Sequence, residues 1–196
     1  MTEELIRAVT QADTPARMVS AVQNLAAAKD PAAIPTLIAV FGYNNPAAAA
    51  IAVAALTELG EQAVPQLLAQ IDDYNYGARA YSIRTLAAIA DPRAIDVLIT
   101  AATTDFAPSV RRAAARGLGN LHTANLSFSQ SQTALSALLF ISQDSDWSIR
   151  YAAVVGLQAL ANVAEIQQPI RARLKEMLAN DAEKAVRARV LLAQSQ

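Results

Sequence analysis

The hexapeptide DWSIRY, which begins at Asp146, brings together three kinds of side chain that can hold a ligand. Asp146 offers a carboxylate, Trp147 (the chain's only tryptophan) and Tyr151 offer rings, and Arg150 offers a guanidinium group. Carboxylates accept hydrogen bonds from N–H groups, guanidinium groups bind carboxylates through paired hydrogen bonds, and rings stack on flat conjugated molecules. Such a cluster could form a binding site, or it could be the ordinary start of a helix.

The usual catalytic motifs are absent from the sequence. It contains no glycine-rich nucleotide-binding loop, no HExxH zinc motif and no GxSxG nucleophile motif. With 0 Cys and 1 His, it lacks the ligands of a conventional metal site, and we expect no metal. The single histidine, His122, begins the polar stretch HTANLSFSQSQ, which we interpret as a long loop between helices.

A repeat of about 31 residues organises the chain. The segments DPAAIPTLI, GEQAVPQLL and DPRAIDVLI begin at Asp30, Gly60 and Asp91, and each continues with apolar residues at helical spacing. Ala-rich helices such as PSVRRAAARGLGNL lie between them, and their small residues allow close helix packing. Two helices per unit and short turns predict an all-α fold, a right-handed α-solenoid of about five to six HEAT-like hairpins. We expect it to form a single domain over residues 1–196.

A second regularity divides the opening cluster into repeated and unique positions. In four places an acid precedes a helix-entry arginine by six residues. In a HEAT-like solenoid each such acid is expected to pair with an arginine of its own or the next repeat, forming a ladder of ion pairs. Asp144 and Arg150 are therefore structural first, whereas Asp146, Trp147 and Tyr151 are additions to the repeat pattern. The four pairs are Asp73/Arg79, Asp105/Arg111, Asp144/Arg150 and Asp181/Arg187.

Aromatic residues recur at these helix-entry turns. Entry turns of successive repeats lie along one edge of a solenoid, so their rings should form a stripe interleaved with Arg and Asp. We interpret Phe106 as a hydrophobic cap of its hairpin. The other rings could also be hydrophobic caps, but we favour their interpretation as a surface for a flat, conjugated, carboxylate-bearing ligand or for a partner protein. The rings of this surface are Tyr74, Tyr76, Tyr81, Trp147 and Tyr151, with Arg84 and Arg150 near two of them.

The composition narrows the function classes. Because 16 Lys plus Arg stand against 17 Asp plus Glu, the chain lacks the basic excess that is typical of nucleic-acid-binding domains. The apolar runs are too short to cross a bilayer, and the N-terminus MTEELIRAV has acids where a signal peptide would carry basic residues. We therefore expect a cytoplasmic protein that neither binds nucleic acid nor inserts into a membrane.

The segments DPRAIDVL and PSVRRAAARGLGNL resemble the HEAT-like repeats of the phycobilisome lyases, and the similarity covers roughly residues 16 to 192. The segment DWSIRYAAVVGLQAL is similar to the smaller, F-type subunit of the heterodimeric E/F lyases. The resemblance implies a cyanobacterial cytoplasmic protein that works with a larger E-type partner. It implies attachment of phycocyanobilin, a linear tetrapyrrole, to a cysteine of the phycocyanin α subunit. It also implies no intrinsic cofactor, with phycocyanobilin as the bound substrate.

The resemblance also suggests roles for the clustered residues. Arginines would bind the two propionates of the bilin, an acid would accept the pyrrole N–H groups, and rings would stack on the chromophore. A Tyr or His would donate the proton as sulfur adds. The expected catalytic residues are Asp146, Tyr76 and His122, and the expected bilin-binding residues are Arg79, Tyr81, Arg84, Trp147, Arg150 and Tyr151.

The sequence departs from the isomerising F-type subunits at one motif, and two alternative functions stay open. The isomerising F-type subunits carry an Asn-His-Cys motif, but here His122 is followed by Thr123, so plain attachment without isomerisation is expected. A HEAT-repeat adaptor that binds a protein, and a bilin without attaching it, is the first alternative. A HEAT-like DNA-repair glycosylase is the second, although the net charge of −1 argues against its basic groove.

Overall fold

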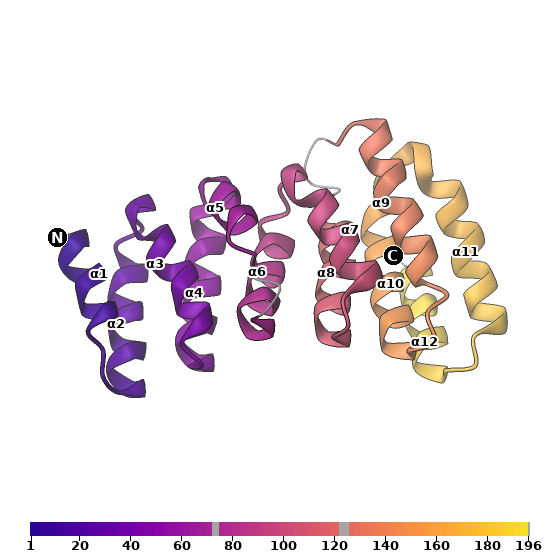
Figure 1. Cartoon of the computed structure of the whole chain (residues 1–196). Coiled ribbons are helices and arrows are strands. Elements are labelled where there is room, and N and C mark those ends of the chain that lie inside the picture. The colour runs from indigo at the N-terminus through magenta and orange to yellow at the C-terminus, as the bar shows by residue number, and fades with distance from the viewer. Residues whose placement is uncertain (72–74, 122–125, 196) are drawn as a thin grey trace. The chain divides into compact units, whose positions relative to one another are not determined.

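The computed structural model describes residues 1–71, 75–121 and 126–195. In these residues the chain forms helices and no strand, arranged as successive antiparallel hairpins (Figure 1). The part of the chain that the structure describes has twelve α-helices, which pair into six hairpins, α1 with α2 through to α11 with α12. The expected all-α fold of about five to six hairpins is therefore confirmed.

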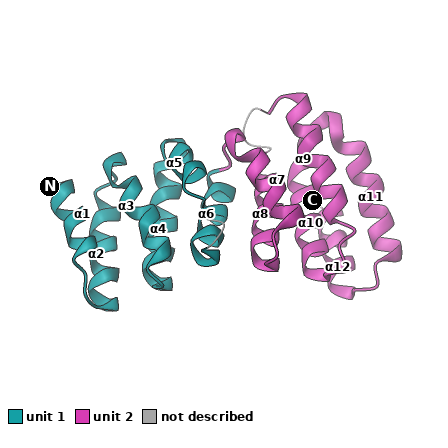
Figure 2. Cartoon of the chain, in the orientation of Figure 1, with its two compact units in different colours: residues 1–89 teal, residues 90–196 magenta. Residues whose placement is uncertain are grey.

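Residues 1–89 form one compact unit and residues 90–196 a second (Figure 2). In the first unit, the second helices of successive hairpins pack side by side: α2 on α4, and α4 on α6. The single domain expected over residues 1–196 stays a prediction. The α-helices of the first unit are α1 (Thr2–Thr10), α2 (Pro15–Ala27), α3 (Ile34–Ala39), α4 (Pro46–Leu59), α5 (Val64–Ala69) and α6 (Tyr76–Ile89).

The second unit repeats this arrangement. Its second helices α8, α10 and α12 pack in sequence, and α7 packs on α9. The bounds of its α-helices are α7 (Ile95–Thr104), α8 (Pro108–Asn120), α9 (Phe128–Ile141), α10 (Trp147–Leu160), α11 (Gln167–Asn180) and α12 (Lys184–Gln194).

Short 3₁₀ turns introduce several first helices. Asp30 caps η1 by accepting a hydrogen bond from the amide of Ala32, at 2.9 Å, and Pro31 follows at the first helical position. Asp91 caps η4 in the same way. Each Asp-Pro dipeptide thus caps a 3₁₀ turn that leads into an α-helix. These turns are η1 (Pro31–Ala33), η3 (Gly60–Gln62), η4 (Pro92–Ala94) and η6 (Ala164–Ile166), whereas a further 3₁₀ turn, η2 (Val40–Gly42), follows α3.

The core is built from Leu, Ile, Val and Ala at matching places in successive repeats. Five leucines, one in each second helix from α2 to α10, are completely buried, so the repeat period places equivalent side chains in one continuous interior in each unit. The five are Leu25, Leu56, Leu86, Leu118 and Leu157.

Two glycines allow α8 and α10 to approach closely. A Cβ atom on Gly119 would lie 2.6 Å from the Cα atom of Gly156. A Cβ atom on Gly156 would lie 2.5 Å from the carbonyl oxygen of Ala115. Real Cβ atoms do not make such contacts, so this helix pair needs glycine at both positions.

Candidate functional site

The start of α10 holds four of the predicted site residues within its first turns. Asp146 is the N-cap residue, and its Oδ1 atom accepts hydrogen bonds from both the amide and the hydroxyl of Ser148, each at 2.7 Å. Arg112, on α8, donates from Nη1 to the Ser148 hydroxyl at 3.0 Å. The cap therefore joins two successive repeats, and the link through Arg112 and Ser148 was not foreseen from the sequence.

The same contacts fix the protonation state of Asp146. Hydrogen bonds from the side chain and then the backbone of Ser148 lower the pKa of its carboxyl group below the ordinary value. An ionised carboxylate accepts hydrogen bonds and cannot donate a proton at neutral pH. This suits the expected role of accepting pyrrole N–H groups, and leaves proton donation to another residue.

A ladder of ion pairs is present in the second unit, but the expected partners were wrong: the carboxylate of each acid binds the arginine of the preceding repeat, because the stacking of the hairpins brings that arginine within reach. Each arginine pairs with the acid of the following repeat: Arg111 with Asp144, and Arg150 with Asp181. Arg111 donates from Nε to the backbone carbonyl of Ala102 at 3.0 Å, whereas Arg150 donates to the backbone carbonyl of Asp144, the acid of its own repeat, at 2.8 Å. Arg187 makes the same bond to the carbonyl of Asp181. The carboxylate of Asp144 or Asp181 thus binds the arginine of the preceding repeat, and the backbone carbonyl of the same acid binds the arginine of its own repeat. In the first of the four pairs, Asp73 lies outside the described residues.

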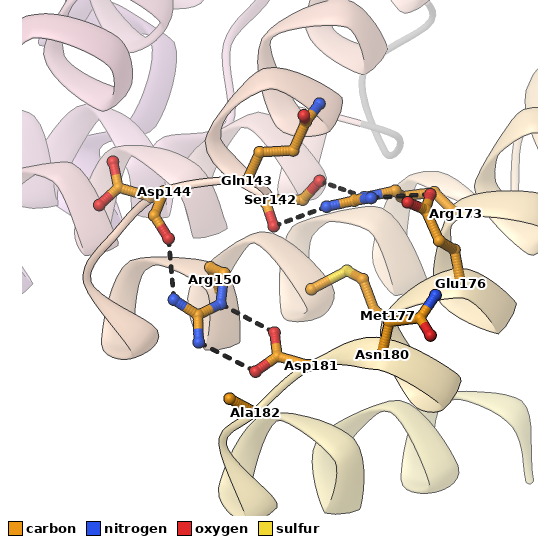
Figure 3. A pocket seen from close by; sticks show the side chains of 10 residues that line it. All are labelled: Ser142, Gln143, Asp144, Arg150, Arg173, Glu176, Met177, Asn180, Asp181 and Ala182. Atoms are coloured by element: carbon orange, nitrogen blue, oxygen red, sulfur yellow. Dashed lines mark hydrogen bonds and ion pairs between the residues drawn. The ribbon is translucent and has the colours of Figure 1, made fainter.

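Arg150 is engaged on all three of its nitrogens. Its Nε and Nη2 atoms bind the two oxygens of Asp181 at 2.8 and 2.9 Å (Figure 3). Its Nη1 atom also donates to the carbonyl of Ser145 at 3.1 Å. The hydrogen bonds that Arg150 donates to Asp181 lower the pKa of Asp181 and raise the pKa of Arg150, so both groups stay charged. A propionate would have to compete with Asp181 for this guanidinium group.

A pocket of about 350 Å³ opens beside the ladder (Figure 3). Arg173 crosses it, donating to the hydroxyl of Ser142 at 2.7 Å, to its carbonyl at 3.0 Å and to Glu176 at 2.8 Å. Because the guanidinium groups of Arg150 and Arg173 are both bound to protein oxygens, the pocket wall carries little unused charge. We regard this pocket as part of the inter-repeat bonding rather than as a ligand site.

The other predicted cluster lies on α6, in the first unit. The guanidinium carbon of Arg79 lies 5.9 Å from the ring centre of Tyr76, and that of Arg84 lies 5.7 Å from the ring centre of Tyr81. Arg79 is buried and Tyr81 stacks on Phe41 at 5.5 Å, so both contribute to the packing of this unit. Tyr76 and Arg84 are the exposed members.

The predicted site residues therefore fall into two clusters, one in each unit, and they differ in how exposed their side chains are. Tyr76 is 44% exposed and Trp147 48% exposed, which leaves their rings open to a ligand. Tyr151 is half-buried. His122 and Tyr74 lie outside the described residues. The site roles of all these residues stay predictions.

A groove of about 1050 Å³ lies between α10, α11 and α12, where sequence reasoning placed no site. Cations from two helices line it: Arg171, Lys175 and Arg189. The sequence signal that could have indicated it is weak, a pair of cations four residues apart on one helix.

Within the described ranges, no helix is long and apolar enough to span a membrane, and no group of three or more His, Cys, Asp and Glu residues could hold a metal ion.

Comparison with known proteins supports the resemblance. The HEAT repeats family matches residues 64–158 and 101–194. A phycocyanobilin lyase subunit beta of Nostoc sp. (strain PCC 7120 / SAG 25.82 / UTEX 2576) is 76% identical over 200 residues, which cover 100% of both chains. The chain belongs to the family of phycocyanobilin lyase beta subunits. The expected similarity to F-type lyase subunits and the HEAT-repeat fold are thereby confirmed.

Two further relatives agree with this family. The phycocyanin alpha phycocyanobilin lyase CpcF of Synechocystis sp. (strain ATCC 27184 / PCC 6803 / Kazusa) is 45% identical, over 96% of this chain and 91% of its own length. Among solved structures, a chain in the complex of CpcE and CpcF of phycocyanin lyase from Nostoc sp. PCC7120 is 78% identical. Its TM-score is 0.79, and the match covers 84% of this chain and 99% of that one.

Proposed function

We propose that the chain is one subunit of a heterodimeric bilin lyase of the cyanobacterial cytoplasm. With a larger E-type partner, it would bind phycocyanobilin and catalyse its attachment to a cysteine of the phycocyanin α subunit. The observation that carries this proposal is the 76% identity to a phycocyanobilin lyase subunit beta over the whole of both chains. The relative found in a complex of CpcE and CpcF supports the need for a partner.

The chemistry required is the addition of a thiol S–H across the ethylidene double bond on the A-ring of the bilin. Sulfur bonds to the ethylidene carbon and one proton is delivered to the ring, so nothing leaves. The nucleophile belongs to the acceptor protein, which agrees with a chain that has 0 Cys. The tasks left to the lyase are to hold the bilin, exclude competing reactions and supply the proton.

The described residues suit the holding tasks. The lowered pKa of Asp146 keeps an ionised acceptor beside the exposed ring of Trp147 at the start of α10. Tyr76 and His122 remain the predicted proton donors. Phycocyanobilin would be bound as substrate, without an intrinsic cofactor. Because Thr123 follows His122, we propose attachment without isomerisation.

Reconstitution tests this function. The chain, an E-type partner, phycocyanobilin and apo-phycocyanin α subunit are mixed, and the products are separated under denaturing conditions. We expect a chromophore that stays on the acceptor after denaturation, that requires both lyase subunits, and that disappears when the acceptor cysteine is replaced by serine. A mixture that binds bilin but leaves it extractable would show a non-enzymatic adaptor instead.

A further inference from the structure

The groove between α10, α11 and α12 has the dimensions of a ligand site. Its volume of about 1050 Å³ lies just above the usual range of small-molecule pockets, which ends at about 1000 Å³. All of its lining residues fall between Val155 and Gln194, so it lies within one unit of the chain. The wall includes apolar side chains from two helices, among them Val155, Ile170 and Leu174, which suit a hydrocarbon framework.

The charged side chains that line the groove are all positive. Arg171, Lys175 and Arg189 line it, and among the described residues no carboxylate does. Arg171 and Lys175 are one turn apart on α11, an arrangement in which like charges repel and destabilise a helix. A bound anion would reverse that cost.

Three of the four acids in residues 155–194 serve other groups, and the fourth, Glu165, does not line the groove. Glu176 pairs with Arg173 at 2.8 Å, and Asp181 is held by Arg150. Glu183 caps α12 through the amide of Ala185. The folded chain therefore directs these three carboxylates to helix caps and other arginines, and leaves the groove positive.

Arg189 adds an independent observation. Its Nη2 atom donates to the side chain of Gln158, whereas its Nη1 atom is buried and has no hydrogen-bond partner among the described residues. A buried donor without an acceptor costs free energy, and a ligand oxygen would remove that cost. The three cations that line the groove and the unpaired Nη1 donor of Arg189 both favour a ligand that carries acceptor oxygens.

We propose that this groove binds the propionate groups of a linear tetrapyrrole, with Arg171 and Lys175 contacting the carboxylates. The proposal rests on the proposed bilin lyase function and deepens it by naming the site. A linear tetrapyrrole combines a long conjugated framework with two carboxylates, which matches an apolar wall beside three cations. If the propionates bind in the groove, Arg150 is not needed to bind them, which agrees with its guanidinium group being held by Asp181.

The test changes the protein and the ligand together. The heterodimer with the E-type partner is titrated with phycocyanobilin and with its dimethyl ester, and binding is followed by the bilin absorption. We expect the Arg171→Gln/Lys175→Gln variant to bind phycocyanobilin roughly ten- to a hundred-fold more weakly than the wild type. It should bind the acid and the ester equally, whereas the wild type prefers the acid. Lys184→Gln, which removes an exposed cation that does not line the groove, should behave as the wild type.

The outcomes separate the groove from the function. The proposal that the groove binds the propionates is overturned if the wild type binds phycocyanobilin and its dimethyl ester equally. It is also overturned if the double variant still prefers phycocyanobilin to the ester. The ester comparison on the wild type holds even if the variant folds poorly. The transfer reaction is assayed separately. No covalent product from the wild type overturns the proposed function, whereas normal transfer by the double variant at an unchanged KM for bilin overturns the groove alone.

Discussion

Arg150 binds Asp181 through two parallel hydrogen bonds, at 2.8 and 2.9 Å, across the boundary between successive repeats. The two side chains are 16% and 5% exposed, so solvent screens the pair little. The same arginine donates to the backbone of the repeat that contains it. One guanidinium group therefore ties the entry turns of two hairpins together.

Removing this pair should destabilise the second unit. We expect Asp181→Ala to lower the free energy of unfolding by about 2–3 kcal/mol, because it leaves a partly buried guanidinium group without its carboxylate. A double-mutant cycle with Arg150→Ala, measured by urea denaturation, should give a coupling of about 1–2 kcal/mol.

A matched control is available in the first unit. Arg17 pairs with Asp13 at 3.0 Å, but these side chains are 71% and 65% exposed. Asp13→Ala should therefore cost less than about 0.5 kcal/mol. Equal effects of Asp13→Ala and Asp181→Ala would show that the ladder adds nothing beyond an ordinary surface pair.

The ladder also predicts how stability depends on pH. The hydrogen bond from Arg150 lowers the pKa of Asp181 in the folded state, so the unfolded state binds the proton more tightly. The contribution is complete above the unfolded pKa of about 4 and is lost as the pH falls through the lower, folded pKa. Thermal unfolding from pH 7 to pH 2.5 should show a midpoint that falls in the acid range.

The charge-neutral variant Asp181→Asn isolates this contribution. Its unfolding midpoint should be lower at neutral pH and should change less with acidification than that of the wild type. Other carboxyl groups with lowered pKa values, such as that of Asp146, keep part of the slope in both proteins. Identical pH profiles for the two proteins would remove Asp181 from the acid sensitivity.

The close contact of α8 and α10 gives a prediction about packing. Gly156→Ala places a Cβ atom 2.5 Å from the carbonyl oxygen of Ala115, so the helices must separate. We expect a loss of about 1–3 kcal/mol in the free energy of unfolding, measured with urea.

Gly77→Ala is the matched control for this substitution. Gly77 is also helical, but the nearest atom to its Cβ position is a side-chain oxygen of Asn75, at 3.5 Å. The alanine should be tolerated, or should stabilise the helix by up to about 1 kcal/mol. If Gly156→Ala were equally harmless, the two helices would be less constrained than their spacing indicates.

The sequence contained the repeat and the ladder, but not which groups the ladder joins. The six-residue spacing between Asp144 and Arg150 predicted that both take part. Because helix stacking brings the next acid within reach, the side chain of Arg150 meets Asp181 rather than Asp144. A one-dimensional pattern reports equivalent positions, whereas the pairing depends on the distance between stacked hairpins.

The cationic groove shows the same limit more strongly. Arg189 lies on a different helix from Arg171 and Lys175, and only tertiary packing brings all three to one hollow. Their spacing belongs to no repeat pattern and no known motif in the sequence. Asp146, by contrast, was singled out because it departs from the repeat, and the structure adds that it is also an N-cap.

The two roles of Asp146 can be separated by its replacements. Asn is as good an N-cap as Asp, so Asp146→Asn should keep the helix start and change the unfolding midpoint little, while removing the negative charge. Asp146→Ala should lose both, at a cost of about 1 kcal/mol in stability. If Asp146 accepts the pyrrole N–H groups, both variants lose bilin transfer in the reconstituted reaction, although Asp146→Asn folds and co-purifies with the partner. If the residue is only a cap, Asp146→Asn transfers bilin like the wild type, and Asp146→Ala differs from it in stability alone.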